Sequence, residues 1–404
     1  MERKVQNNPV VKRVRQLLSL SGMQPPHTGT DLSLIFTLLA FYFGFETCIC
    51  LIKNWPQIHS RLLALEDIII SIIMIMCCME FAYAPAHIQC LLNILDESYF
   101  NGYAETESEQ KKEIIKKAVD RERITAKSIE TLSFITAFNL NILPIFILIK
   151  KMVEGESLFE NVEDLPLPFE YSYTFVNCNL VSFLVIYAVE SIWFIISAPA
   201  FACCVYMVTV LAMRRVKTEL DLLIISLNDL DKSIGHDKNL GDEYNQLIIE
   251  QKLKSRLRNF VRHHYFIIQK VNELNMGLKL TPTITLQAFC SLICFCLWYI
   301  VKGEEIVLKV KYVSFLIPLL IYLFLYAAAG QDIINGQEQL AITLFECPWM
   351  DKPKWFKTSI ATMMLFVNKP LYVKQFGIYK LDMPYFSKIL NAGYSYFNLL
   401  NTVQ

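Results

Sequence analysis

The fold of this chain is decided by its long apolar runs, of which residues 310–330, VKYVSFLIPLLIYLFLYAAAG, are an example with a single charged residue, Lys311. A helix that crosses a membrane needs roughly 20 mainly apolar residues. Because lipid offers no hydrogen-bonding partners to a bare backbone, a run of this kind is predicted to be a helix. Further runs of the same character are residues 32–52, 64–86, 129–150, 176–213, 280–301 and, less apolar, 376–403.

The composition of the whole chain agrees with a membrane protein. Hydrophobic residues make up 54% of the 404 residues and charged residues only 19%, against about 25% charged residues in soluble proteins. The fourth run has neither glycine nor proline over residues 187–196, so it is predicted to be one long helix that Pro199 kinks but does not reverse. The sequence therefore predicts an all-α membrane protein with seven transmembrane helices.

The distribution of lysine and arginine predicts the orientation of these helices, because basic residues are in excess on the cytoplasmic side. The amino-terminal segment holds five of them, the loop after the second run seven and the loop at 214–275 eleven, whereas the alternate connections hold seven altogether. We therefore expect a cytoplasmic amino terminus and an extracellular carboxyl terminus. A G-protein-coupled receptor has the opposite orientation and an acidic-Arg-Tyr motif after its third span, whereas Asp120-Arg121-Glu122 precedes the third span here.

The charged residues, the cysteines and the absence of catalytic motifs argue against several classes of function. The net charge is zero, and no basic tail suggests nucleic acid. Most of the twelve cysteines lie in apolar runs and form no CxxC pair, so neither a metal nor a cofactor is expected. No HExxH, nucleophile elbow or phosphate-binding glycine loop indicates an enzyme. A secondary transporter is an open alternative, although the repeats and broken helices typical of transporters are not seen.

The basic loop at 214–275 is predicted to be helical. Apolar residues recur there at helical spacing over 219–230 and 244–274, so the fourth and fifth spans should continue as amphipathic helices below the membrane. Their apolar stripes must be buried, either in a hairpin that packs on itself or in a platform for subunit assembly. His263 and His264 are neighbours that point in different directions, which favours packing or surface roles over metal binding.

An ordered set of residues near the carboxyl end resembles the signature of insect odorant receptors. The set is Tyr326, Gly330-Gln331, Glu338, Pro348-Trp349, Trp355, Met363-Met364-Leu365 and Lys369-Pro370, then Phe376-Gly377, Phe386, Leu390, Tyr394-Ser395-Tyr396-Phe397 and Leu400. The detailed resemblance covers roughly the last 80 residues, while topology and loop lengths agree over the whole chain. One departure is Gly330-Gln331-Asp332, where the family usually has a Gly-Asn/Glu-Glu pattern.

The resemblance implies a division of the chain into functional regions. These are a cytoplasmic amino-terminal segment (1–31), a ligand-binding bundle of transmembrane helices 1–4 (32–213), cytoplasmic helical extensions (214–275), transmembrane helices 5–6 (276–330), a cytoplasmic anchor helix (331–370) and a pore-lining helix (371–404).

The resemblance also implies a function and partners. Family members assemble as tetramers with a shared co-receptor and form odorant-gated, non-selective cation channels in the plasma membrane of olfactory sensory neurons. The implied partners are co-receptor subunits, a volatile odorant, membrane lipid and permeating cations, with no nucleic acid. The chain is shorter than the co-receptor and lacks its insert in the fourth loop, so it looks like the odorant-binding subunit. A gustatory receptor that acts as a homomer is the close alternative.

The resemblance places the odorant in the outer half of spans two, three, four and six. A volatile ligand needs an apolar and aromatic pocket with few polar groups. The lining residues expected from this placement are Ile70, Met74, Phe138, Ile142, Phe183, Tyr187, Phe315, Leu319 and Tyr322. Each of these side chains also suits core packing or lipid contact, and that alternative stays open.

The last span carries a polar stripe. The stripe consists of Asn391, Ser395, Asn398 and Thr402, at steps of four, three and four. That spacing places all four on one helix face, which must meet protein or water because polar groups towards lipid are costly. Two readings are open, namely hydrogen bonds between helices and a water-filled conduction path. Leu399 and Val403 lie beside the stripe at positions similar to the family's hydrophobic gate, where an apolar constriction closes a pore by dewetting.

Overall fold

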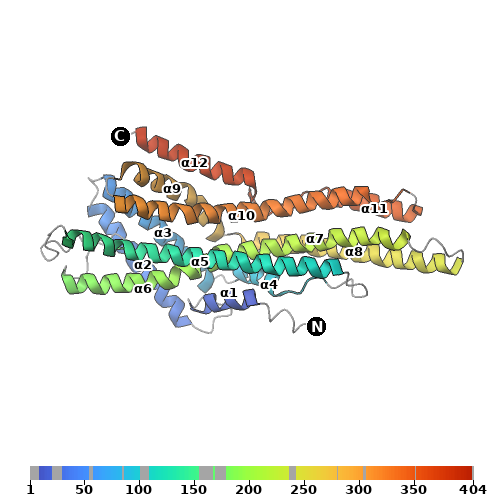
Figure 1. Ribbon diagram of the computed structural model, residues 1–404, viewed down its shortest axis with the longest axis horizontal. Helices are drawn as coiled ribbons and strands as arrows, with labels where there is room; N and C mark the ends of the chain where they lie inside the picture. The colour runs from blue at the N-terminus through green and yellow to red at the C-terminus, as the bar shows by residue number, and fades with distance from the viewer. Residues whose placement is uncertain are drawn as a thin grey trace.

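The computed structural model describes residues 9–20, 30–53, 58–83, 86–100, 109–153, 167–168, 179–235, 243–279, 281–303, 306–350 and 352–402. Over these residues the chain is built of helices and one short hairpin (Figure 1). The elements are α1 (Pro9–Leu20), α2 (Thr30–Lys53), α3 (Ile58–Tyr83), α4 (Ala86–Asp96), α5 (Glu109–Val153), α6 (Leu180–Ala202), the π-helix η3 (Cys203–Met207), α7 (Val208–Gly235), α8 (Glu243–Gly277), α9 (Thr281–Lys302), α10 (Ile306–Glu346), α11 (Lys354–Val367), β1 (Lys374–Gln375), β2 (Tyr379–Lys380) and α12 (Met383–Thr402).

Six helices among the described residues are long and apolar enough to cross a membrane. They are α2, α3, α5, the continuous α6–η3–α7 rod, α9 and α10, and they coincide with the first six apolar runs of the sequence. Large apolar side chains cover the outside of several of them: Leu38 is 58% exposed, Phe138 62% and Leu184 55%. An apolar surface of this extent suits lipid rather than water.

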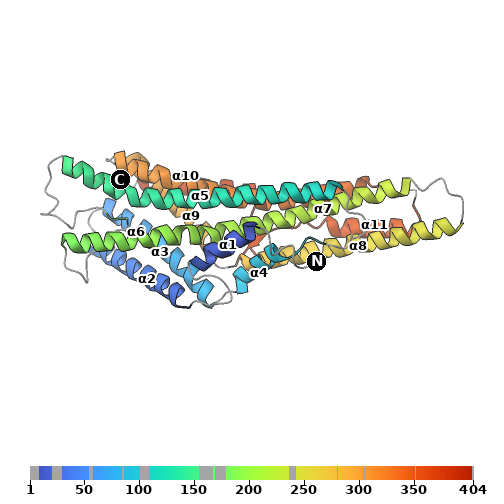
Figure 2. The same cartoon turned by 60° about the horizontal axis from the view of Figure 1, so that its bottom comes forward.

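The molecule is elongated and has two ends of different character. In Figure 1, α2, α3, α6, α9 and α12 gather towards the left, whereas α7, α8, α11 and the second half of α10 extend to the right. Figure 2 shows the same division from another side, with α5 running along much of the length. The amphipathic helices expected in the loop at 214–275 are present as the end of α7 and as α8, and their apolar faces pack together.

The centre of the core is α7, which packs against α5, α8 and α10. Its residues Val208, Leu211 and Leu220 have no exposed surface. The apolar end of α7 is buried by the membrane bundle. Its amphipathic end is buried by α8 and the second half of α10, which together with α11 and the end of α7 form what we call the extension. The fourth apolar run is therefore one continuous helix, as predicted, and it continues beyond residue 213 to Gly235.

The helix bounds near the carboxyl end differ from the expected regions. The anchor expected at 331–370 is not one helix, because α10 continues unbroken from the sixth apolar run to Glu346 and the chain then breaks around Pro348 and Pro353, before α11. The last helix does not begin near residue 376, because β1 and β2 form an antiparallel hairpin there. Phe376 and Gly377 have positive φ, which makes the tight turn, and the Asp382 side chain accepts the Tyr385 N–H at the start of α12.

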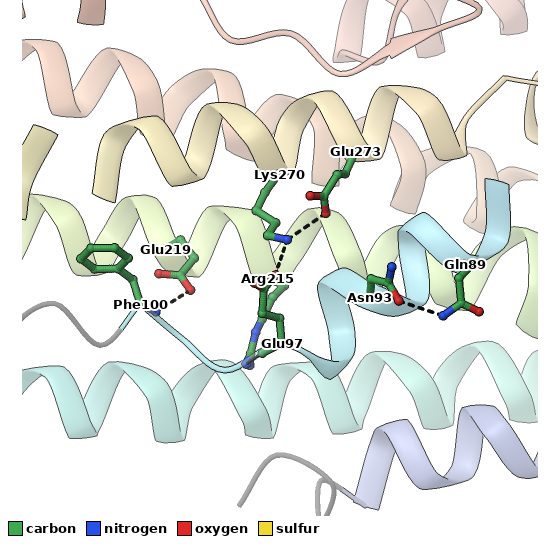
Figure 3. Close-up of polar contacts among 8 residues, drawn as sticks. All are labelled: Gln89, Asn93, Glu97, Phe100, Arg215, Glu219, Lys270 and Glu273. Carbon is green, nitrogen blue, oxygen red and sulfur yellow. Dashed lines mark hydrogen bonds and ion pairs between the residues drawn. The ribbon is translucent and has the colours of Figure 1, made fainter. Parts of the chain in front are cut away.

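A polar joint fastens α4 to the extension, and sequence patterns did not predict it (Figure 3). The segment after α4 lies against α7, where the Phe100 N–H donates to Glu219 (3.2 Å) and Arg215 donates to the Glu97 carbonyl (2.9 Å). Lys270 of α8 pairs with both Glu97 and Glu273. These contacts tie the end of the membrane bundle to the extension.

A buried histidine–glutamate pair lies beside this joint. The Nε2 atom of His263 lies 2.8 Å from the Glu219 carboxylate, and their side chains are 1% and 4% exposed. The Phe100 ring stacks on the His263 ring with a centroid distance of 4.5 Å. Among the residues that the structure describes, no group of three or more His, Cys, Asp or Glu side chains is arranged to hold a metal ion. His263 packs against Phe100 and pairs with Glu219 in this fold.

Candidate ligand-binding site

A cavity of about 150 Å³ lies inside the membrane bundle and is lined by residues of α3, α5, α6, α9 and α10. Its wall is mostly apolar and aromatic, with a few hydroxyl groups and three acidic or basic side chains, Glu66, Asp67 and Lys311. The small polar groups come from Ser133 and Thr136 of α5, Ser197 of α6 and Thr285 of α9. A concave, apolar site with few polar groups is the usual form of a small-molecule site.

The floor of the cavity is a cluster of tyrosines. Tyr206 and Tyr322 stack face to face, with ring centroids 4.3 Å apart and planes 3° apart, and Tyr326 packs edge-on against Tyr206 at 5.8 Å. The Tyr322 hydroxyl donates to the Ile129 carbonyl (3.4 Å), and the Tyr326 hydroxyl donates to the Val205 carbonyl. Hydrogen bonds at the polar ends fix the rings, so the floor links α5, α10 and the α6–α7 rod.

The tyrosine floor rests on an irregular stretch of helix. Tyr206 belongs to η3, the five-residue π-helix between α6 and α7, which begins four residues after Pro199. Proline removes one backbone donor from the helix ladder, and π-helical turns occur frequently at functional sites. The Tyr206 side chain thus enters the cavity from the one described segment that is wound as a π-helix.

The charged residues lie at the end of the bundle where α3 and α10 begin. Glu66 and Asp67 come from α3, and Lys311 comes from α10. Glu66 is 5% exposed, hydrogen-bonds with the Tyr312 side chain and lies near the Lys311 ammonium. The Tyr312 ring stacks in turn on Tyr299 of α9 at 4.3 Å. This end of the cavity is therefore polar, and the opposite end is the tyrosine floor.

The structure brings together five of the nine residues expected to surround a ligand. Ile70 and Met74 of α3 and Phe315, Leu319 and Tyr322 of α10 all line the cavity. The other four do not. Phe138 is 62% exposed on the outside of α5, and Ile142 is half-buried one turn further along.

Phe183 and Tyr187, the expected residues of α6, lie away from the cavity. Phe183 is 2% exposed and stacks on Tyr187, whose hydroxyl donates to the Asn141 carbonyl of α5. The cavity meets α6 instead at Phe194, Ser197 and Phe201, two to five turns further along the helix. The cavity is thus deeper in the bundle than the sequence placed it on this helix.

Several cavity residues were missed by sequence reasoning. On α5 the lining residues are Ser133, Thr136 and Leu140, whose steps of three and four mark one face. Small hydroxyl residues on a membrane helix also suit helix packing, so this face alone does not identify a cavity. Tyr206 was likewise missed, because no periodic pattern reveals a π-helix. Phe289 was missed because the expected site did not include the fifth span, which is α9.

The last helix shows two faces. Tyr385, Ile389 and Gly393 are buried, and α12 packs mainly against α9. All four residues of the expected polar stripe are exposed on the other side, as is Leu399 at 62%: Asn391, Ser395, Asn398 and Thr402. Val403, the second expected gate residue, lies outside the described residues.

The start of α12 is fixed to three other helices. The Lys374 N–H donates to the Asn275 side chain of α8 (2.7 Å), and Gln375 donates to the Pro282 carbonyl of α9 (3.4 Å). The Met383 N–H donates to the Gln331 side chain of α10 (3.3 Å). Gln331 lies nine residues after Tyr322 on the same helix, which is about two and a half turns. The helix α10 therefore contacts both the cavity floor and the start of α12.

Comparison with known proteins places these features in context. The sequence pattern of the family described as 7tm odorant receptor matches residues 58–394. Odorant receptor Or2 of Anopheles gambiae is 21% identical over 151 residues, 37% of this chain and 40% of that receptor. Odorant receptor 10 of Aedes albopictus is 25% identical over 146 residues, 35% of this chain and 38% of that receptor. The matched stretch thus spans less than half the length of these relatives.

The fold is similar to a solved structure over nearly its whole length. The insect olfactory receptor OR5 from Machilis hrabei superposes with a TM-score of 0.73 at 16% identity and covers 98% of both chains. The same receptor in complex with eugenol gives a TM-score of 0.71 at 17% identity, again over 98% of both chains. At this identity the likeness establishes the architecture, including the arrangement of α12 beside the other helices.

Proposed function

The chain belongs to the 7tm odorant receptor family, and we propose that it is the odorant-binding subunit of a ligand-gated, non-selective cation channel. It is a multi-pass membrane protein and a receptor rather than an enzyme. The observation that carries the proposal is the cavity of about 150 Å³, whose wall is mostly apolar and aromatic and whose helix α10 also bonds to the start of the last helix.

In this proposal the odorant occupies the cavity with its apolar body against the tyrosine floor. Ile70, Met74, Phe315 and Leu319 form the side walls, and Tyr322 forms the floor with Tyr206. A ligand shifts a conformational equilibrium only as far as it binds the two states differently. A bound odorant would contact the stacked Tyr206–Tyr322 pair directly. We therefore propose that a change in this stack makes the odorant bind the open state more tightly than the closed state.

The pore is proposed to be lined by the exposed polar face of α12. In a single chain that face, which includes Asn391, Ser395 and Asn398, has no covering helix among the described residues, although polar groups are costly in lipid. A second copy or a co-receptor subunit that places its own α12 opposite would enclose a polar path. Leu399 is exposed beside the stripe and is the proposed gate, closing the path by dewetting.

The proposed partners and orientation follow from the same features. A cytoplasmic amino terminus agrees with the excess of lysine and arginine on one side. The extension of α7, α8, α10 and α11 would then lie in the cytoplasm and join subunits in a heterotetramer with co-receptor chains. The proposed location is the plasma membrane of olfactory sensory neurons, where permeating cations carry the signal.

Whole-cell current tests the proposal. The chain is expressed alone and together with a co-receptor, and a panel of volatile esters, alcohols, amines and terpenes is applied. We expect a fast cation current, independent of nucleotides, in the co-expressing cells. The Tyr322→Ala variant should lose most of the response, whereas Phe134→Ala, which removes an exposed ring of α5, should keep it. Silence towards the whole panel despite surface expression, or equal responses of both variants, would contradict the proposal.

A further inference from the structure

One serine hydroxyl on the cavity wall differs from the other small hydroxyl groups there. Ser133, Thr136 and Thr285 each donate to a backbone carbonyl three or four residues earlier in their own helix, at 2.7, 2.9 and 2.8 Å. Ser197 of α6 lines the same cavity and is 2% exposed, yet its Oγ atom has no hydrogen-bond partner within the part of the chain that the structure describes. Its O–H group is therefore available to a ligand.

An unpaired hydroxyl at this depth favours a ligand that accepts a hydrogen bond. Removing a hydroxyl from water without a new hydrogen bond is unfavourable, and a serine in a helix often avoids this by bonding to its own backbone. A ligand with an acceptor oxygen supplies the bond that Ser197 lacks. A carbonyl oxygen does so without bringing a donor that needs a partner of its own, as an alcohol would.

The surroundings of Ser197 make this one polar contact selective. Phe194 and Phe201 lie three residues before it and four residues after it, so all three side chains share one face of α6, and all three line the cavity. A hydrogen bond among aromatic rings is electrostatically stronger than the same bond in water. A site built around such a bond discriminates against an analogue that lacks the acceptor, because the buried donor is then left unpaired.

The charged side chains of the wall favour an uncharged ligand. Glu66 interacts with the Tyr312 hydroxyl and with the Lys311 ammonium, and Asp67 has an interaction of its own. A charged ligand would lose its hydration and would have to compete with these existing contacts. A neutral ligand leaves them intact.

The size of the cavity limits the body of such a ligand. A cavity of about 150 Å³ is the size that accepts one benzene molecule in a protein core. A single ring with a short side chain, or an aliphatic chain of similar volume, fills it. A fused-ring or long-chain odorant does not fit without widening the bundle.

We propose that the cavity selects compact, neutral carbonyl compounds such as volatile ketones, whose oxygen accepts a hydrogen bond from Ser197 while the hydrocarbon body lies against Phe194 and Phe201. This inference rests on the proposed use of the cavity as the odorant site, but it concerns binding alone and is tested without reference to channel opening.

The test compares two probes of nearly equal shape, acetophenone and α-methylstyrene, in which a CH₂ group replaces the carbonyl oxygen. The full-length protein in lipid nanodiscs is heated in sealed capillaries with increasing concentrations of each probe, and the shift of the unfolding temperature gives an apparent Kd. Because the two probes enter the lipid to different extents, each apparent Kd is compared between the wild type and a variant.

Ser197→Ala should weaken acetophenone binding at least about fivefold and leave α-methylstyrene binding unchanged or tighter. Without a ligand this variant should unfold at or above the wild-type temperature, because it removes an unpaired buried hydroxyl. If it unfolds early instead, Ser197→Cys takes its place, since cysteine has a similar size and only a weak S–H donor. An unchanged acetophenone Kd, equal weakening of both probes, or no binding of acetophenone to the wild type would overturn the inference.

Ser71→Ala is the matched control. Ser71 of α3 is also 2% exposed, and its Oγ atom likewise lacks a hydrogen-bond partner among the described residues, but it lies beside Gly44 of α2 and not on the cavity wall. This variant should leave both apparent Kd values unchanged. Selective loss of acetophenone binding in Ser197→Ala, in a protein that passes no ligand-evoked current, would uphold this inference and refute the channel proposal. A current that acetophenone evokes equally in the wild type and Ser197→Ala would do the reverse, so the two failures are distinguishable.

Discussion

At the scale of single residues, the Glu219 carboxylate has two partners in the joint beside α4. It pairs with His263 and accepts the Phe100 N–H, all with little exposure to water. Removing one partner of a buried pair leaves the other charge or donor uncompensated, which costs more than the pair itself contributes.

Glu219→Ala should therefore destabilise the protein by about 3–5 kcal/mol, seen as a lower apparent unfolding temperature in detergent or nanodiscs. The control is Glu250→Ala, which breaks the exposed pair with Lys254 on α8 and should cost about 0.5 kcal/mol or less. Similar effects of the two variants would show that the joint beside α4 contributes little to stability.

His264, the neighbour of the paired histidine, gives the extension a pH dependence. Burial, and secondarily the nearby His263, lower the pKa of His264 from 6.5 to about 4. The folded state thus binds a proton less readily than the unfolded state. The stability from keeping His264 neutral is fully present above pH 6.5 and declines as the pH falls from 6.5 towards 4.

On this basis the apparent unfolding temperature should fall between pH 7 and pH 5, with a loss of about 2 kcal/mol at pH 5 from His264. His264→Gln should flatten that dependence, measured by thermal unfolding across a pH series. The opposite sign, a gain of stability on acidification that disappears in His264→Gln, would contradict the assignment.

Site residues could be predicted where the apolar and aromatic side chains of a helix lie on the face that lines the cavity. On α3 and α10 the expected residues line the cavity, because large apolar and aromatic side chains there leave little choice of face. On α5 we expected the aromatic Phe138 to line the cavity, but its side chain lies outside. The small residues Ser133 and Thr136 line the cavity instead. Composition shows which residues prefer an apolar environment, but it does not distinguish a cavity wall from a lipid-facing surface.

At the scale of elements, the apolar runs predicted the membrane helices because lipid imposes a length and excludes charge. The short amphipathic helices α1 and α4 were missed, since their apolar faces are defined only by the helices they contact. The hairpin at 374–380 was missed for a similar reason. It is held by Asn275 and Pro282, far away in the sequence.

The contact between α10 and the start of α12 requires a glycine. A Cβ added at Gly330 would lie 2.1 Å from the Leu381 carbonyl oxygen, a backbone atom that cannot rotate away. Gly336 on the same helix is less constrained, because its nearest neighbours are the ends of the Lys217 and Leu220 side chains, at 3.0 Å and beyond.

Gly330→Ala should displace α12 from α10, so it should reduce ligand-evoked current at least about tenfold, the effect of roughly 1.4 kcal/mol on the opening equilibrium. Gly336→Ala should change the current little. Both currents are normalised to surface expression measured with an extracellular tag. A Gly330→Ala channel with normal current would rule out this contact as the route from cavity to pore.

At the scale of the whole molecule, the chain joins two regions of opposite character. The cavity lies among helices whose outer surfaces suit lipid, and the extension supplies paired charges and amphipathic faces. The six apolar helices and their order could be predicted from the sequence. The exposed polar face of α12 could not be interpreted in the same way, because its role depends on the neighbouring subunits. No pattern in one chain specifies how many such faces meet or which partner supplies them.

The most direct measurement of the central claim is the accessibility of α12 during channel opening. Asn398→Cys is expressed with a co-receptor, opened with an activating volatile from the panel and exposed to a positively charged thiol reagent. Wild type and Ile389→Cys, on the buried face, are measured in parallel. The account predicts that the reagent reduces the current of Asn398→Cys alone, and faster while the volatile is present. An Asn398→Cys current that the reagent leaves unchanged, or block of Ile389→Cys instead, would contradict a pore lined by this face of α12.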